Sequence, residues 1–175
     1  MAVRPIRTVP DPVLRQKAKR VLSIDKAVLR LIADMEDTLR EANGVGLAAP
    51  QVGVSRRLIV CCIPEDKEKG KAEERYCLVN PEIVRRTGER TVKEGCLSIP
   101  GYLGEIKRSA QVRVRGLDKE GKEVKVRASG LLAQALEHEI DHLNGVLYVD
   151  HLESQDKLQK VEPEPAEEEP APQKQ

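Results

Sequence analysis

Phenylalanine and tryptophan are absent from this chain of 175 residues, and only three tyrosines are present. The core must therefore be built from Leu, Ile, Val and Ala, which can close-pack without aromatic rings. The sequence also lacks an apolar run of the roughly 18–20 residues that a membrane-spanning helix needs. The first residues, MAVRPIRTVPDP, lack the apolar segment of a signal peptide. We therefore expect a cytoplasmic protein with no membrane contact.

Cysteine is scarce too, with four in the chain, and disulfides are not expected in the cytosol. Cys61 and Cys62 lie in the apolar run LIVCCI, and Cys77 lies in RYCLVNP. We interpret these three as packed thiols. Cys96 has different neighbours, because EGCLSIPGY surrounds it with glycines and a proline.

Charge is nearly balanced, at +1 overall, but it is unevenly distributed. The last 23 residues hold seven acidic and three basic groups, so the rest of the chain is mildly basic. Such a Glu- and Pro-rich tail cannot bury enough apolar area to offset the entropy of ordering it. We predict a folded domain over residues 1–152 and an acidic tail over 153–175 that is disordered from about residue 161. A basic body is compatible with contact with a polyanion, but no direct readout of nucleic-acid sequence is expected.

Apolar periodicity predicts one long N-terminal surface helix over residues 23–43, with Ser23 as its N-cap and Gly44 ending it in a left-handed conformation. A last helix is predicted over residues 130–144, after Ser129. Its apolar residues surround the helix axis, so we expect it to be buried with strands packed around it. Strands are predicted over residues 57–63, 76–84, 111–115 and 123–127, the last two as a hairpin.

Two of the three histidines lie four positions apart in EHEIDHLNG, within this predicted buried helix. Positions i and i+4 project about 40° apart on one helical face, so the imidazoles of His138 and His142 can converge on one ion. This is the H-E-x-x-H pattern of metal hydrolases, in which Glu139 can reach a water without being a ligand. The pattern therefore predicts a divalent metal site inside the molecule.

A metal held by two histidines needs at least a third protein ligand. His151 is one candidate, and it follows a break in the helix. Cys96 is the other, because nearby glycines let the backbone approach an ion closely and a thiolate is a strong donor for a transition metal. The residues favour Cys96 but leave both candidates open.

Three motifs, taken in order, resemble those of the peptide deformylase family: GVGLAAPQ at 44–51, EGCLS at 94–98 and HEIDH at 138–142. The resemblance covers roughly residues 3–152. It implies an α+β fold, with β-sheets packed around a central buried helix that carries HEIDH. It also implies a bacterial-type enzyme that removes the N-formyl group from the formyl-methionine of newly made polypeptides and releases formate.

The resemblance implies that Cys96, His138 and His142 bind the metal and leave the fourth position to water. Glu139 would take a proton from that water and hand it to the departing amine. A Cys-His-His set suits Zn²⁺ on geometry alone. The resemblance instead implies Fe²⁺ in the cell, with Zn²⁺, Ni²⁺ or Co²⁺ as substitutes.

Further roles follow from the same resemblance. The side-chain amide of Gln51 and the backbone N–H of Leu97 would stabilise the oxyanion. Gln134 is a departure, since many relatives carry an apolar residue there. The residues expected to contact the substrate are Val45, Gly46, Val92, Leu131 and Ala135.

Charged residues near the motifs have open roles at this stage. Glu94 is expected to orient Gln51 or the Cys96 loop, and Arg108 and Asp141 are expected to pair. A surface ion pair explains all three equally well.

Two other functions remain open from the sequence. H-E-x-x-H alone would fit a metallopeptidase that cleaves ordinary peptide bonds and uses His151 as a ligand. The basic body and acidic tail would fit a non-catalytic, metal-stabilised module that binds the ribosome. For the deformylase, the expected partners are N-formylmethionyl nascent peptides and the ribosome near its exit tunnel.

Overall fold

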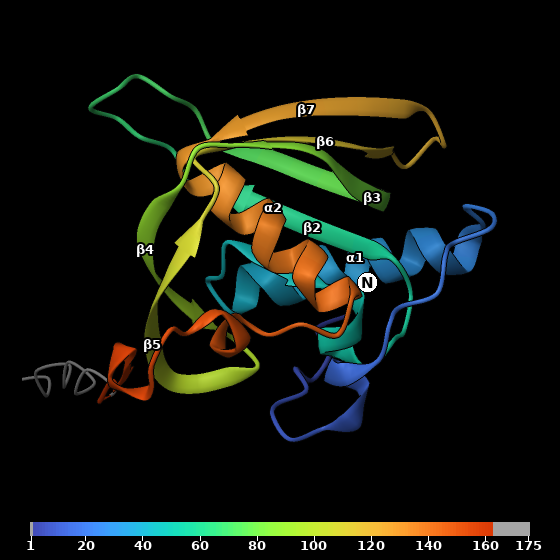
Figure 1. The fold of residues 1–175 in the computed structure, drawn as a ribbon. Helices are drawn as coiled ribbons and strands as arrows, with labels where there is room; N and C mark the ends of the chain where they lie inside the picture. The colour runs from blue at the N-terminus through green and yellow to red at the C-terminus, as the bar shows by residue number, and fades with distance from the viewer. Residues whose placement is uncertain (1, 163–175) are drawn as a thin grey trace, which may run out of the picture.

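The computed structural model describes residues 2–162, which form two α-helices and two β-sheets (Figure 1). This confirms the mixed α+β class. None of the helices in this part of the chain is long and apolar enough to cross a membrane. The elements are η1 Pro12–Arg15, α1 Lys26–Glu41, β1 Gly46–Ala48, η2 Ala49–Val52, β2 Leu58–Ile63, β3 Glu74–Thr87, β4 Arg90–Cys96, β5 Ile99–Arg108, β6 Gln111–Leu117, β7 Glu123–Ser129, α2 Gly130–Leu143, η3 Tyr148–His151, η4 Gln155–Lys157 and β8 Leu158–Lys160, where η marks a short 3₁₀ segment.

The sheets differ in size and in what they cover. The larger has the strand order β1-β2-β3-β6-β7, and the smaller has the order β4-β5-β8. Helix α2 packs on one face of the larger sheet, with the β4–β5 hairpin beside it (Figure 1). Ten of its fourteen residues are buried, including both histidines of HEIDH. The helix therefore carries polar side chains inside the molecule.

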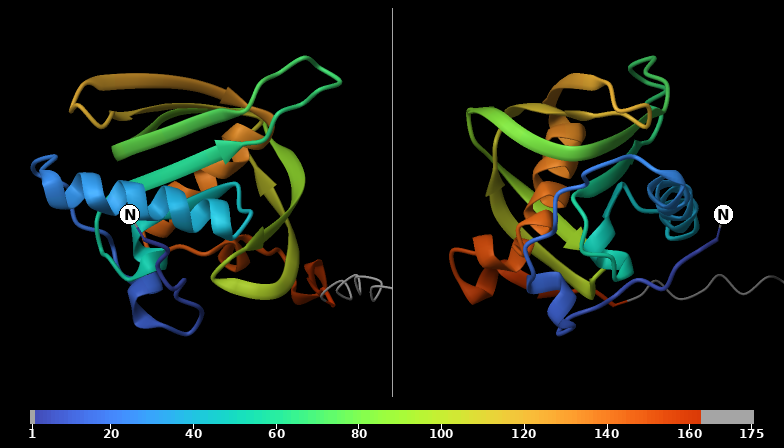
Figure 2. Two further views of the ribbon diagram at one scale, coloured as in Figure 1. Left: turned by 180° about the vertical axis from the view of Figure 1, so that it is seen from behind. Right: turned by 90° about the vertical axis from the view of Figure 1, so that its right-hand side faces the viewer.

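Helix α1 lies on the outside of the molecule, along β2 (Figure 2). Its Leu31, Ile32 and Met35 pack against side chains of β1 and β2. Strand β2 is thus buried on both faces, because Leu58 and Val60 belong to the core under α1 while Ile59 and Cys61 belong to the core under α2. A strand that is buried on both faces has an unbroken run of apolar residues. This explains why the β2 sequence, LIVCCI, does not alternate apolar and polar residues.

The ends of α1 differ from the prediction. Asp25, and not Ser23, is the N-cap, and its Oδ1 accepts a hydrogen bond from Val28 N at 2.9 Å. At the other end Asn43 has the left-handed φ, 50°, where Gly44 was predicted to have it. Both cap predictions were wrong, because a carboxylate three residues before a free N–H is a strong cap and asparagine tolerates positive φ.

The β4–β5 hairpin is not predicted by the sequence. Its buried positions include Glu94 and Arg108, so the alternation of apolar and polar residues that marks a strand is lost. Cys96 is the last residue of β4, where the register with β5 shifts. The stretch EGCLSIPGY, expected to form a loop around Cys96, is therefore the tip of this hairpin: the end of β4, a turn at residues 97–98 and the start of β5.

Residues beyond 152 continue the fold. Strand β8 pairs with β5, and Val161 N donates to Gly101 O at 2.8 Å. The predicted tail therefore includes β8, which is an edge strand of the smaller sheet, and the residues from 153 that lead to it. Residues 163–175, where most of the predicted disorder falls, lie outside the described residues.

Candidate metal centre

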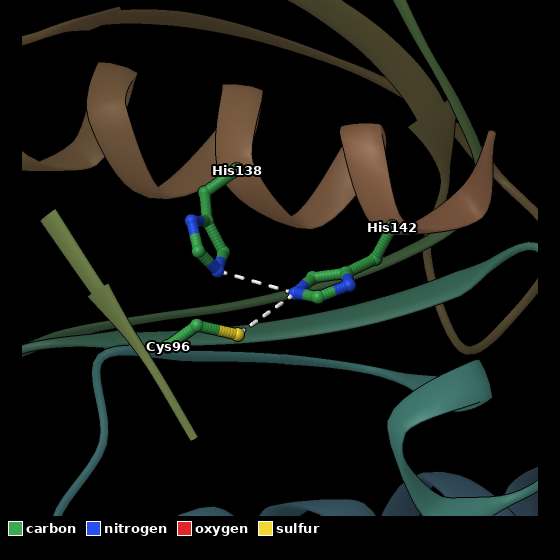
Figure 3. Close-up of side chains that lie close together, drawn as sticks. All are labelled: Cys96, His138 and His142. Atoms are coloured by element: carbon green, nitrogen blue, oxygen red, sulfur yellow. Dashed lines mark hydrogen bonds between the residues drawn. The ribbon is translucent and has the colours of Figure 1, made fainter. Parts of the chain in front are cut away.

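Three potential metal ligands converge between the end of β4 and the last turns of α2 (Figure 3). Cys96 Sγ lies 3.3 Å from His142 Nε2, and that nitrogen lies 3.2 Å from His138 Nε2. All three ligand atoms fall within 4.8 Å of one another. Ligands held about 2.0–2.3 Å from a tetrahedral ion lie about 3.3–3.7 Å apart. The donor set and its spacing therefore fit one divalent metal ion.

A carboxylate on β4 fixes the orientation of His138. Glu94 Oε2 lies 2.6 Å from His138 Nδ1, so Nδ1 donates its proton there and Nε2 is left to bind a metal. The same carboxylate accepts two hydrogen bonds from Arg108, at 3.1 and 2.6 Å. Arg108 also donates to Asp141 Oδ2 at 2.7 Å. Glu94 thus contacts His138 and Arg108, and not Gln51 as one of the sequence interpretations had it.

The charged side chains of Arg108 and Glu94 are buried, so they do not form the surface ion pair that the sequence left open as an alternative. The side chains of Arg108 and Glu94 are 2% and 5% exposed. Burial alone would raise the pKa of Glu94, but the hydrogen bonds from His138 and Arg108 outweigh it and lower the pKa to about 2. Glu94 is therefore ionised at neutral pH and can hold the proton on His138 Nδ1. Burial, with His138 nearby, lowers the pKa of His142, so that ring is neutral and able to bind a metal.

Glu139 lies beside the ligands without belonging to the cluster. It is 3% exposed, and its Oε2 is buried with no hydrogen-bond partner among residues 2–162. Burial is the main cause that raises the pKa of Glu139 to about 7. The backbone of β1 approaches it closely, since a Cβ on Gly46 would lie 2.5 Å from Glu139 Oε1. The position needs glycine, and the carboxyl group can take or give a proton near neutral pH.

Gln51 presents its amide nitrogen to the cluster. Ala48 N donates to Gln51 Oε1 at 2.9 Å, which fixes the orientation of the amide. Gln51 Nε2 then lies 3.2 Å from Ser98 Oγ and 3.7 Å from Cys96 Sγ. The sequence gives Ser98 no role, but the structure shows that it helps to hold a buried amide toward the site.

A cleft of about 380 Å³ opens onto the cluster. Of the predicted substrate contacts, Val92 does not line it and instead packs with the core beneath β4 and β5. Gln134 lines the cleft, and its Nε2 donates to Lys93 O at 3.4 Å. The predicted residues that do line the cleft are Val45, Gly46, Gln51, Cys96, Leu97, Leu131, Ala135, His138 and Glu139.

His151 does not join the cluster. Its Nε2 lies 2.8 Å from Asp141 Oδ2, so it extends the Arg108 network toward solvent. The sequence reasoning missed Glu137, which is buried, accepts a hydrogen bond from Ser109 N at 3.2 Å and lies 3.9 Å from Arg108 Nη1. The sequence could have indicated this, because Glu137 lies four residues before Asp141, and residues with this spacing share one face of a helix.

Comparisons with known proteins agree with this geometry. The family model described as polypeptide deformylase matches residues 3–158. The peptide deformylase of Dehalococcoides mccartyi strain CBDB1 is 52% identical over 164 residues, which cover 94% of this chain and 95% of that protein.

The chain belongs to the peptide deformylase family.

Solved deformylase structures have the same fold. One from Legionella pneumophila has a TM-score of 0.82 and 49% identity, and the match covers 89% of each chain. One from Acinetobacter baumannii, described as bound to Met-Ala-Ser, has a TM-score of 0.80 and 33% identity, covering 86% of this chain and 99% of that one. The family is metal-dependent and removes the N-formyl group from nascent peptides, so the chain is a hydrolase of this kind. The metallopeptidase and the non-catalytic module are not supported.

Replacement of Arg108 by methionine tests the network that orients His138. Arg108→Met leaves the buried Glu94 carboxylate without its main counter-charge. We expect the free energy of unfolding to fall by about 3–5 kcal/mol and metal affinity to fall about 10–100-fold. Urea unfolding and metal titration measure the two effects.

Arg115→Met is the matched control, because Arg115 and Glu82 form a pair at 3.0 Å whose side chains are 55% and 61% exposed. Its loss should change stability by only about 0–1 kcal/mol, with no effect on the metal. Equal effects of the two substitutions would contradict the role given to Arg108.

Proposed function

We propose that this deformylase holds one divalent metal ion through Cys96 Sγ and the Nε2 atoms of His138 and His142. The observation that carries the proposal is the convergence of these three donors within 4.8 Å of one another, with Cys96 and His138 lining the cleft. A bound ion would act as a Lewis acid and lower the pKa of a water molecule toward neutrality. We propose Fe²⁺ in the cell, with Zn²⁺, Ni²⁺ or Co²⁺ as substitutes, because thiolate and imidazole donors suit all four.

Glu139 is the proposed proton carrier. Its buried Oε2 is free to accept a proton from the water that adds to the formyl carbon. When the carbon–nitrogen bond breaks, the same oxygen returns that proton to the departing amine, and formate leaves. A pKa raised to about 7 suits both steps at neutral pH.

Gln51 and Leu97 are the proposed oxyanion donors. The orientation of the Gln51 amide, set by Ala48 N, supports this because it directs Nε2 toward the thiol and into the site. Leu97 follows the thiol directly and lines the cleft. A donor held in place before the reaction stabilises developing charge without reorganisation.

The substrate backbone is proposed to run along β1. This strand is an edge of the larger sheet, and an edge strand can pair with an extended peptide. The proposed partners are the N–H of Val45 and the carbonyl of Gly46. The methionine side chain would lie against Leu131 and Ala135, next to the polar Gln134, and Val92 would support the pocket only from the core behind it.

The setting of the reaction follows from its substrate. A formylated nascent chain exists at or soon after its exit from the ribosome, so we propose a cytoplasmic enzyme that acts near the exit tunnel. The catalytic domain proposed over residues 1–152 holds every residue assigned above.

Glu139→Gln tests the proton carrier. The amide cannot accept the proton, so formate release from a formyl-Met peptide should fall about 10²–10⁴-fold. Metal content should stay at one ion per chain, because Glu139 is outside the cluster. Unchanged formate release with full metal content would remove Glu139 from the mechanism.

Cys96→Ala and His151→Ala together test the ligand set. Elemental analysis of protein purified without oxygen should show that Cys96→Ala loses the metal and that His151→Ala keeps it. The reason is that His151 contacts Asp141 and lies outside the cluster. The reverse pattern would require a different third ligand.

Gln51→Leu tests the oxyanion donor. Removal of one such donor typically lowers kcat by about 10²–10³-fold, and KM for a formyl peptide should change little. A change confined to KM would mean that Gln51 binds the substrate without stabilising the oxyanion.

A further inference from the structure

The face of the larger sheet that is turned away from α2 carries a row of arginines. Arg85 of β3 is paired in register with Arg113 of β6, and Arg113 is paired with Arg127 of β7. All three side chains are exposed, whereas Val112 and Val114, which flank Arg113 on β6, point inward to the core under α2. Three guanidinium groups therefore stand side by side on the outer surface of three neighbouring strands (the strands are seen at the top of Figure 1).

A second row of polar side chains lies next to the arginines. Thr87 is paired with Gln111, and Gln111 with Ser129, again across β3, β6 and β7. The two rows line a hollow of about 390 Å³, and no carboxylate lines it. Each of these polar side chains can donate hydrogen bonds. The hollow is thus built for an acceptor with negative charge.

The arginine row forms no ion pair in the part of the chain that the structure describes, although Arg127 also lines a neighbouring hollow that contains carboxylates. The next row along the strands, by contrast, places Arg115 against Glu82 at 3.0 Å. Like charges directly opposite each other on neighbouring strands destabilise a sheet. An anionic partner outside the chain would compensate for this repulsion.

We propose that this hollow and its arginine row, Arg85, Arg113 and Arg127, bind the phosphate backbone of helical RNA. Neighbouring strands lie about 4.8 Å apart, so the row spans about 10 Å, and each strand of a duplex carries about three phosphates over that length. The face offers no ring for stacking with unpaired bases, because the tyrosines lie on β5, in η3 and on the α2 side of β3. Contact with a duplex backbone needs no stacking. A nascent-chain substrate brings the enzyme close to ribosomal RNA, which is such a polyanion.

The test measures binding of a fluorescein-labelled 20-base-pair RNA duplex to the full-length, metal-loaded protein by anisotropy at 50–200 mM salt. Contact with three phosphates predicts an affinity that falls about 40-fold across this range. The triple variant Arg85→Gln, Arg113→Gln and Arg127→Gln should bind at least 10-fold more weakly at 50 mM salt. Its salt slope should be smaller by about 3.

The matched control is Arg20→Gln, Arg30→Gln and Arg56→Gln, which removes the same charge from exposed arginines outside the hollow. The control should bind the duplex like the unsubstituted protein. The control should keep the melting temperature, and the arginine-row variant should keep or raise it, because it loses the repulsion between neighbouring strands. Both should keep the rate of formate release from a short formyl peptide, since neither touches the metal site.

Three outcomes would overturn the proposal. The first is that the duplex does not bind. The second is that the two triple variants lose affinity equally, which would mean that binding follows net charge alone. The third is that the protein binds phosphatidylserine vesicles in preference to RNA. Because formate release is measured on the same samples, loss of RNA binding is distinguished from loss of the enzyme.

Discussion

The hydrogen bonds of Glu94 join the two parts of the molecule that make the site. Its carboxylate, on β4, accepts from Arg108 on β5 and from His138 on α2. Strand β4, which ends in Cys96, is thereby fixed to the helix that carries both histidines. If Glu94 were neutral, the hydrogen bond from His138 Nδ1 would lose its charged acceptor and weaken, and Arg108 would be a buried charge with a weaker partner. The ligand geometry thus depends on a charge network that has no direct contact with a metal.

The polar groups around the cleft are each held in place by a particular neighbour. Ala48 N and Ser98 orient Gln51, Glu94 orients His138, and the close backbone of Gly46 confines Glu139. Each of these groups, which we propose to bind the metal or to take part in the reaction, is thus held by a neighbour. Such preorganisation is what allows fixed donors and acceptors to stabilise a developing charge in a buried site.

The sequence predicts well where local pattern and burial agree, and poorly where they conflict. The HEIDH helix, strand β2 and the β6–β7 hairpin follow from apolar periodicity, and the ligand candidates follow from residue types and spacing. The β4–β5 hairpin escapes prediction because its inner face carries Glu94 and Arg108, which read as surface residues. Val92 was placed in the substrate pocket by resemblance, but a strand alternates its side chains and the structure turns this one to the core beneath the hairpin.

X-ray absorption at the metal edge of the anaerobically purified protein tests the central claim most directly. A single ion held by the three residues should show one sulfur scatterer at about 2.3 Å and two imidazole nitrogens at about 2.0–2.1 Å, with at least one oxygen completing the shell. A spectrum without sulfur, or with four protein ligands and no oxygen, would contradict the account, because the hydrolysis would then lack either its third ligand or its place for water.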